Sequence, residues 1–267
     1  MKRRKAVKRI LYFVSSLVIL FALWNLRQEQ DSAEETQSLY EGLSRQAADE
    51  AESTADEDEV LAGSPRELPE EVFAPENEWL IKLQEENGDL AAWIRIPNTH
   101  IDYPVMQSER DPDYYLHRDF DKREQYHGTP YLDVNCDLDE SENLIVYGHN
   151  MKDGSMFQNL MKYREADFCR DNGLILFSTP EKTYEYQVCL VMLISGAEAE
   201  EFPFYRYTEL SDESSYQEYL DKCKAYAIWT DEESLRSAAP LLCLATCEYS
   251  REDGRMVVIA RRSSAGS

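Results

Sequence analysis

The sequence has little of what metal sites and nucleic-acid-binding proteins need. Of its 267 residues only 4 are histidine, and none of its 6 cysteines stands in a Cys-x-x-Cys pair. A structural zinc site needs such ligands at close spacing, so we expect none. Positive charge is also scarce, since 28 lysines and arginines against 52 acids leave a net charge of −24. Such a body repels phosphate backbones, which excludes a nucleic-acid partner.

The few positive charges are concentrated at the N-terminus. Residues 1–27 carry seven basic groups and no acid. This pattern predicts a cytoplasmic basic segment over residues 1–9 and a transmembrane signal anchor over residues 10–26, because that apolar run just suffices for a hydrocarbon core of roughly 30 Å. We expect a single-pass protein of the cell membrane whose folded body is extracellular. A cleaved signal peptide is the alternative, although no clear small-x-small cleavage site follows the run.

The next segment, residues 27–71, is acidic, polar and poor in aromatic residues. It cannot bury enough apolar surface to offset its ordering entropy, so we expect a disordered stalk. From residue 72 the composition changes, and residues 72–267 are the predicted folded domain. One helix is expected over Glu76–Asn87 and another over Ser211–Thr230, with Ser211 as its N-cap.

Most of the folded domain has the pattern of β-strands. Short apolar or alternating runs are separated by Pro, Gly, Asn and Asp, which favours a mainly antiparallel fold. The runs are residues 93–96, 101–105, 143–147, 174–178, 183–195, 241–247 and 255–260. We expect a closed β-barrel with peripheral helices.

The cysteines allow two interpretations. Three disulfides are the simplest use of six cysteines outside the membrane, and they would suit a non-catalytic surface module. However, Cys243 and Cys247 lie four residues apart on one strand, roughly 13 Å from each other, so they cannot be bonded together. Cys247 ends that apolar strand where the chain turns polar, a position in which a thiol can meet a substrate as a nucleophile.

Two other polar residues, His149 and Arg255, stand at the end or the start of an apolar run, where they could lie near Cys247. His149 ends the apolar run at residues 143–147 after Gly148, which lets the chain turn sharply beside the imidazole. Arg255 follows Cys247 by eight residues, so a hairpin would bring its forked donors alongside the thiol, where they could hold a carbonyl or an oxyanion. The remaining histidines stand in polar, turn-like stretches and are expected to face solvent.

These motifs resemble those of the sortases, the membrane-anchored cysteine transpeptidases of Gram-positive bacteria. The resemblance runs from about Asn87 to Arg262 and is carried by the order of several short pieces. They are NGDL at 87–90, WIRIP at 93–97, IDYPV at 101–105, YYL at 114–116, YLD at 131–133, YGHN at 147–150, LATC at 244–247, and Arg255. Class B sortases are the most similar, since they carry a helix before the barrel and a long helix between strands six and seven. This implies a closed eight-stranded sortase-type β-barrel.

The resemblance also implies a reaction. Cys247 would attack the Thr carbonyl of a C-terminal sorting pentapeptide on a secreted protein, and an amine of a peptidoglycan precursor or cross-bridge would resolve the thioacyl-enzyme. His149 would act as acid and base, and Arg255 would stabilise the tetrahedral intermediates. The reaction would need neither a metal nor an organic cofactor. By the same matching, Leu116, Ala245 and Glu248 would contact the peptide, although many class B enzymes have Ser where Ala245 stands. The sequence leaves a membrane-anchored cysteine peptidase, which passes the same intermediate to water, as the alternative.

Overall fold

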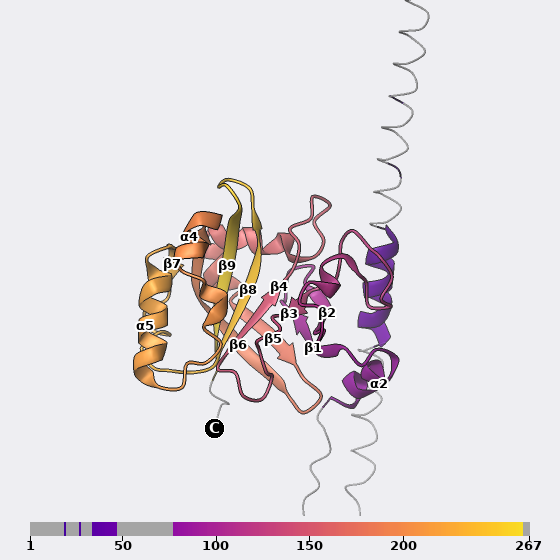
Figure 1. The fold of residues 1–267 in the computed structure, drawn as a ribbon, viewed down its shortest axis with the longest axis horizontal. Coiled ribbons are helices and arrows are strands. Elements are labelled where there is room, and N and C mark those ends of the chain that lie inside the picture. Colours follow the sequence, from indigo (N-terminus) through magenta and orange to yellow (C-terminus); the bar gives the residue numbers. More distant parts are fainter. Residues whose placement is uncertain (1–18, 20–26, 28–33, 47–76, 264–267) are drawn as a thin grey trace, which may run out of the picture.

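The barrel is a ring of eight strands, and it confirms the expected fold class (Figure 1). The computed structural model describes residues 19, 27, 34–46 and 77–263. The ring has the order β5-β1-β2-β3-β4-β8-β9-β6, a pairing of β5 with β6 closes it, and β7 pairs with β6 outside it. The strands are β1 (Leu90–Arg95), β2 (Asp102–Met106), β3 (Tyr131–Leu132), β4 (Asn143–Tyr147), β5 (Leu174–Ser178), β6 (Thr183–Ile194), β7 (Ala227–Thr230), β8 (Leu241–Glu248) and β9 (Gly254–Arg262).

Helices lie on the flanks of this barrel (Figure 1). The expected helix before the barrel is α2 (Glu78–Glu86), which buries Leu80 and Leu83. The others are α3 (Ala166–Asp171), α4 (Gly196–Glu201) and α5 (Glu213–Lys224), together with the 3₁₀ helices η1 (Tyr114–His117), η2 (Phe157–Arg164) and η3 (Phe204–Arg206). The pairings β2–β3 and β4–β8 are parallel and the rest of the ladder is antiparallel, so the sheet is mainly antiparallel as predicted.

The second expected helix is correct only in its first part. It ends at Lys224, and the following β7 pairs with β6. Trp229 lies opposite Val191 in this ladder, so pairing with β6 overrides the local helical spacing. The N-cap of this helix, α5, is Asp212 rather than Ser211, because the Asp212 carboxylate accepts a hydrogen bond from the backbone N–H of Ser215 at 2.7 Å.

Residues 34–46, which the sequence places in a solvated stalk, form a helix against the barrel, drawn in indigo in Figure 1. Thr36, Tyr40 and Leu43 are buried with exposures of 2%, 2% and 6%. Their 4-3 spacing places them on one helical face, which the acidic composition of the segment conceals. The rest of the predicted stalk, residues 28–33 and 47–71, lies outside the described residues.

The predicted localisation has to be corrected. No helix among the residues that the structure describes is both long enough and apolar enough to cross a membrane. The described residues therefore give no support to the predicted single-pass localisation. Apart from Ile19, the residues 10–26 on which that expectation was based lie outside the described part of the chain.

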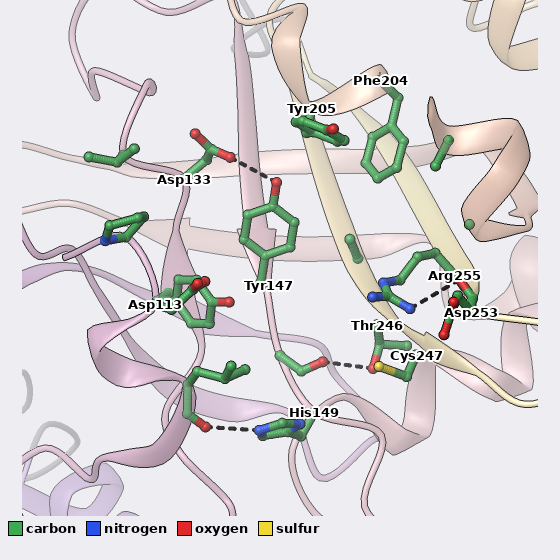
Figure 2. Close-up of a pocket in the computed structure, with 18 of the residues that line it drawn as sticks. Asp113, Asp133, Tyr147, His149, Phe204, Tyr205, Thr246, Cys247, Asp253 and Arg255 are labelled. Atoms are coloured by element: carbon green, nitrogen blue, oxygen red, sulfur yellow. Dashed lines mark hydrogen bonds between the residues drawn. The ribbon is translucent and has the colours of Figure 1, made fainter. Parts of the chain in front are cut away.

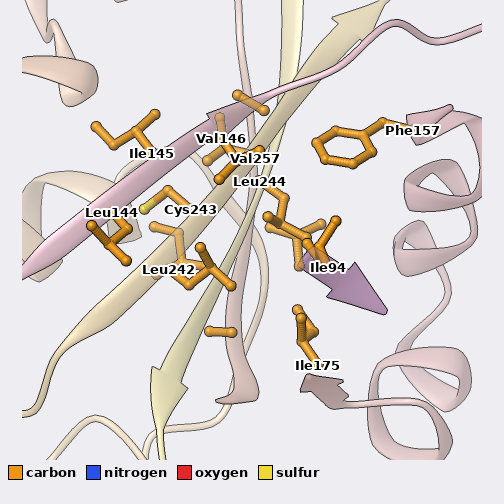
Figure 3. Close-up of a cluster of buried hydrophobic side chains, with 14 of the residues drawn as sticks. Ile94, Leu144, Ile145, Val146, Phe157, Ile175, Leu242, Cys243, Leu244 and Val257 are labelled. Atoms are coloured by element: carbon orange, nitrogen blue, oxygen red, sulfur yellow. The ribbon is translucent and has the colours of Figure 1, made fainter. Parts of the chain in front are cut away.

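Part of the buried core lies where β4 runs beside β8. Leu144 pairs with Leu242 and Val146 with Leu244, so these four side chains share one face of the sheet. Figure 3 shows Phe157 of η2 beside this group, and each apolar side chain of this kind contributes about 1.5–3 kcal/mol when fully buried. This packing fixes the ends of both strands, where the candidate functional residues lie.

Candidate active site

Cys247 and Arg255 lie directly opposite each other in the β8–β9 ladder. Opposed residues of an antiparallel pair point to the same face, so the guanidinium and the thiol stand side by side, as the expected hairpin requires. Ala245, two residues before Cys247, faces the same way. All three residues line one pocket of about 630 Å³.

His149 reaches this pocket because β4 runs parallel to β8. Gly148 donates its N–H to the carbonyl of Ala245 at 3.1 Å and accepts from the Thr246 hydroxyl at 2.7 Å, which ties the end of β4 to β8. A Cβ at position 148 would come within 2.7 Å of the Phe157 ring, so glycine is required for this close approach. The Asn150 amide adds a third tie, since it donates to the Cys247 carbonyl at 2.8 Å.

The hydrogen bond of His149 defines which ring nitrogen can exchange a proton. Nε2 lies 2.8 Å from the carbonyl of Leu116, and because a carbonyl only accepts, Nε2 carries the hydrogen. In the neutral ring Nδ1 is then the acceptor. Burial lowers the pKa of His149, the bond to Leu116 partly opposes this, and the neighbouring His117 and His127 lower it further. His117 stacks on the ring with 5.5 Å between centroids.

The six cysteines differ in exposure, and all are free thiols. Cys247 is partly exposed, whereas the other five are buried. Burial raises the pKa of Cys169 to about 11 and that of Cys136 and Cys243 to about 12, so these thiols stay protonated. The structure therefore gives no support to the disulfide-bonded module. Cys247 is the thiol that a substrate can reach.

The pocket extends beyond Cys247, His149 and Arg255. In Figure 2, Cys247, His149 and Arg255 gather at one end, while the aromatic rings of Phe204 and Tyr205 lie toward the other. This second end comes from α4 and η3, which sequence reasoning missed. The sequence did contain a sign of this aromatic end, because Phe204 and Tyr205 directly follow Pro203 in an acidic stretch.

The polar groups of the pocket are mostly paired. Tyr147 donates its hydroxyl to Asp133 at 2.8 Å on the pocket wall, an arrangement that the sequence did not suggest. Within the part of the chain that the structure describes, no group of three or more His, Cys, Asp or Glu side chains is placed to hold a metal ion.

Of the three residues expected to contact a peptide, the structure brings two into the pocket. Leu116 and Ala245 line it. Glu248 does not, because it follows Cys247 and therefore points to the opposite face. Its buried carboxylate forms an ion pair with Arg164 and accepts from the backbone and hydroxyl of Ser250 at 2.9 and 2.8 Å. These contacts anchor the β8–β9 turn, and the contact of Glu248 with a peptide stays a prediction.

One of the histidines expected to face solvent is instead buried. His127 is 4% exposed and its Nε2 lies 2.7 Å from the Asp153 carboxylate. The polar stretch around it gave no hint of this, since its partner Asp153 lies 26 residues further along the chain. His100 and His117 are exposed.

A closed barrel with a cysteine, a histidine and an arginine at one end of a long pocket agrees with what the family comparison finds. Residues 94–263 match the family model described as "Sortase domain". The chain belongs to the sortase family.

Individual relatives identify the class within the family. The chain is 30% identical over 262 residues to sortase B of Listeria monocytogenes, with 97% of each chain covered. The solved structure of sortase B from Listeria monocytogenes has a TM-score of 0.58 at 32% identity and covers 68% of this chain and 99% of its own. The Staphylococcus aureus sortase B–substrate complex shares the fold, with a TM-score of 0.69 at 23% identity over 88% and 99% of the two chains. The protein is a class B sortase, a cysteine transpeptidase of a class that acts on sorting-motif substrates and amine nucleophiles.

Proposed function

We propose that Cys247 is the nucleophile of this transpeptidase, His149 its acid and base, and Arg255 the group that stabilises the oxyanion. The observation that carries the proposal is the convergence of these three side chains at one end of the pocket, with Cys247 opposite Arg255 in the ladder. The sequence supplied the residues, and the β4–β8 and β8–β9 pairings account for their proximity.

The first half-reaction forms a thioester. The Cys247 thiol gives its proton to Nδ1 of His149, and the resulting thiolate attacks the carbonyl carbon of the scissile peptide bond, whose oxygen becomes an oxyanion. The intermediate collapses as the C–N bond breaks, and His149 gives the proton on Nδ1 to the leaving amine. Nε2 keeps its hydrogen throughout because it donates to Leu116, so the ring stays oriented while it exchanges one proton.

The second half-reaction reverses these roles. An incoming amine attacks the thioester carbonyl, Nδ1 of His149 accepts the proton that the amine loses, and the C–S bond breaks to release the thiolate. The lowered pKa of His149 suits this step, since the ring must be neutral to accept a proton.

Arg255 acts on the charge that develops on the carbonyl oxygen. Both of the hydrogen bonds it makes to described residues, at 3.2 and 3.1 Å to the carbonyls of residues 253 and 254, come from Nη1. Its Nε and Nη2 are therefore available to an acceptor. A fixed positive charge beside the attacked carbonyl stabilises the oxyanion more than the uncharged carbonyl of the substrate, and this difference lowers the barrier.

The substrate would be the C-terminal sorting pentapeptide of a secreted protein, with Leu116 and Ala245 contacting its backbone and side chains. The small Ala245 leaves room beside Cys247, and the aromatic end of the pocket offers apolar surface to the residues before the cleaved bond. The acceptor would be an amine of a peptidoglycan precursor or cross-bridge.

Product analysis tests the proposed function. The full chain is incubated with a library of sorting-motif peptides, with and without a peptidoglycan-derived amine, and the products are followed by mass spectrometry. We expect amide products that appear only with the amine. Products of hydrolysis alone, in the presence of saturating amine, would identify a cysteine peptidase instead.

A further inference from the structure

His149 is held in the pocket by two segments besides β4. From one side, the Leu116 carbonyl of η1 accepts the hydrogen of its Nε2. From the other side, Phe157 donates its backbone N–H to the His149 carbonyl at 2.8 Å, and an isolated β-bridge joins Asn150 to Met156. The position of the imidazole therefore depends on what fixes these two segments.

Tyr40, which belongs to the helix at residues 34–46, is linked to each segment through one intermediate, the turn at residues 128–129 or Tyr103. The Tyr40 hydroxyl lies 3.0 Å from the carbonyl of Gly128 and 2.7 Å from Oγ1 of Thr129. Its ring packs edge-to-face on Tyr103 with 5.4 Å between centroids, and the Tyr103 hydroxyl accepts from the backbone N–H of Met156 at 3.2 Å. Tyr40 is 2% exposed and does not line the pocket.

The turn at residues 128–129 packs directly against the Leu116 carbonyl. Gly128 has φ of +59°, and a Cβ at this position would lie 2.3 Å from that carbonyl oxygen, so the two backbones are in close contact. Thr129 ties the same segment again, since its N–H donates to the Tyr115 carbonyl at 3.0 Å and its hydroxyl to the Arg118 carbonyl at 2.8 Å.

We propose that Tyr40 is a positioning residue for the sortase reaction, through which the helix at residues 34–46 fixes the imidazole of His149 from outside the barrel. The inference rests on the role proposed above for His149. Tyr40 acts through the turn at residues 128–129 on Leu116, and through Tyr103 on the loop after His149.

The phenolic hydrogen is the critical atom of this arrangement. Thr129 donates its own hydroxyl hydrogen to the Arg118 carbonyl, so the hydrogen between Tyr40 and the turn has to come from Tyr40. Burial raises the pKa of Tyr40, and the hydroxyl therefore keeps this hydrogen. Without the phenolic hydrogen, the Gly128 carbonyl and Oγ1 of Thr129 lose their Tyr40 partner. This loss favours a rearrangement of the segment that holds Leu116.

Tyr40→Phe in the full chain removes the hydroxyl and keeps the ring. Tyr163→Phe is the matched control, because Tyr163 is also buried and its hydroxyl donates to the backbone carbonyl of Asn172 at 2.6 Å. We expect Tyr40→Phe to lower kcat by about five-fold or more and to leave KM within about two-fold, since misplacing a catalytic group costs rate rather than binding. In Tyr163→Phe, we expect kcat to stay within about two-fold.

The ring of His149 gives a readout independent of turnover. Its Cε1–Hε1 resonance, recorded by NMR well below the melting temperature of each variant, should shift or broaden in Tyr40→Phe and stay unchanged in Tyr163→Phe. An unchanged kcat and an unchanged resonance in folded Tyr40→Phe would overturn the inference. Equal changes in both variants would overturn it as well, because they would indicate a general loss of stability. If the wild-type chain transfers no acyl group, the proposed function fails, while the resonance still tests the coupling of Tyr40 to His149.

Discussion

Cys243 and Cys247 lie on the same strand and face the same side, yet their surroundings give them different chemistry. Cys243 is buried, donates to the Asn143 side chain at 3.1 Å and lies 3.4 Å from the Tyr219 hydroxyl. Burial raises the pKa of this thiol to about 12. Cys247 ends the strand, where the pocket opens. Position along one strand therefore separates a structural cysteine from the proposed nucleophile.

The stacking of His117 on His149 predicts a change in proton affinity. The pKa of His149 is lowered by burial and further by the charge of His117, so His117→Gln should raise it toward its ordinary value. The limb of the pH–rate profile that His149 causes should then move to higher pH. An NMR titration of His149 measures the shift directly, with the exposed His100→Gln as control. A pKa that is unchanged or lower in His117→Gln would contradict this electrostatic account.

At the scale of elements, Gly148 after β4 lies so close to Phe157 of η2 that a larger residue at position 148 should not fit. In Gly148→Ala the new methyl group would lie 2.7 Å from the Phe157 ring, so we expect a loss of about 1–3 kcal/mol in the free energy of unfolding and displacement of His149. Gly88→Ala is the matched control, because its nearest neighbour would be 4.0 Å away. Urea unfolding and turnover check both variants, and a Gly148→Ala protein as stable and active as the wild type would show that η2 adjusts freely.

The elements also show where local sequence patterns suffice. The β8–β9 hairpin was predictable because two apolar runs flank a short polar turn, which fixes the approximate place of Arg255. The helix at residues 34–46 was not, since it buries few side chains, Thr36, Tyr40 and Leu43 among them, and the segment around them is strongly acidic. The strand at residues 227–230 was missed for a related reason, as its partner β6 is far away in sequence.

At the scale of the whole molecule, closure of the barrel depends on pairings between distant segments. The parallel pairings β2–β3 and β4–β8 leave no local trace in the sequence, and the resemblance to sortases rather than periodicity gave the eight-stranded ring. The same holds for the site. His149 and Cys247 were each recognisable at the end of a strand, but the β4–β8 pairing that brings them together was not.

The distribution of cysteines over the molecule predicts the result of thiol counting. In the native chain a small aromatic disulfide reagent should label one thiol rapidly, on Cys247, and after unfolding without reductant it should label all six. The melting temperature should not depend on added reductant, because no disulfide contributes to stability. Fewer than six thiols in the unfolded chain would show that a disulfide exists and would contradict the structure.

The most direct measurement for the central claim is the location of the covalent bond to substrate. The full chain is mixed with a sorting-motif peptide without an amine, quenched in acid within the first turnover, and analysed by intact-protein and peptide mass spectrometry. The account predicts one acyl adduct, on Cys247, which a subsequent amine removes as an amide. Cys247→Ala should form no adduct, while Cys243→Ala, which removes a buried thiol from the same strand, should still form it. An adduct on another residue, or one that persists in Cys247→Ala, would contradict the account.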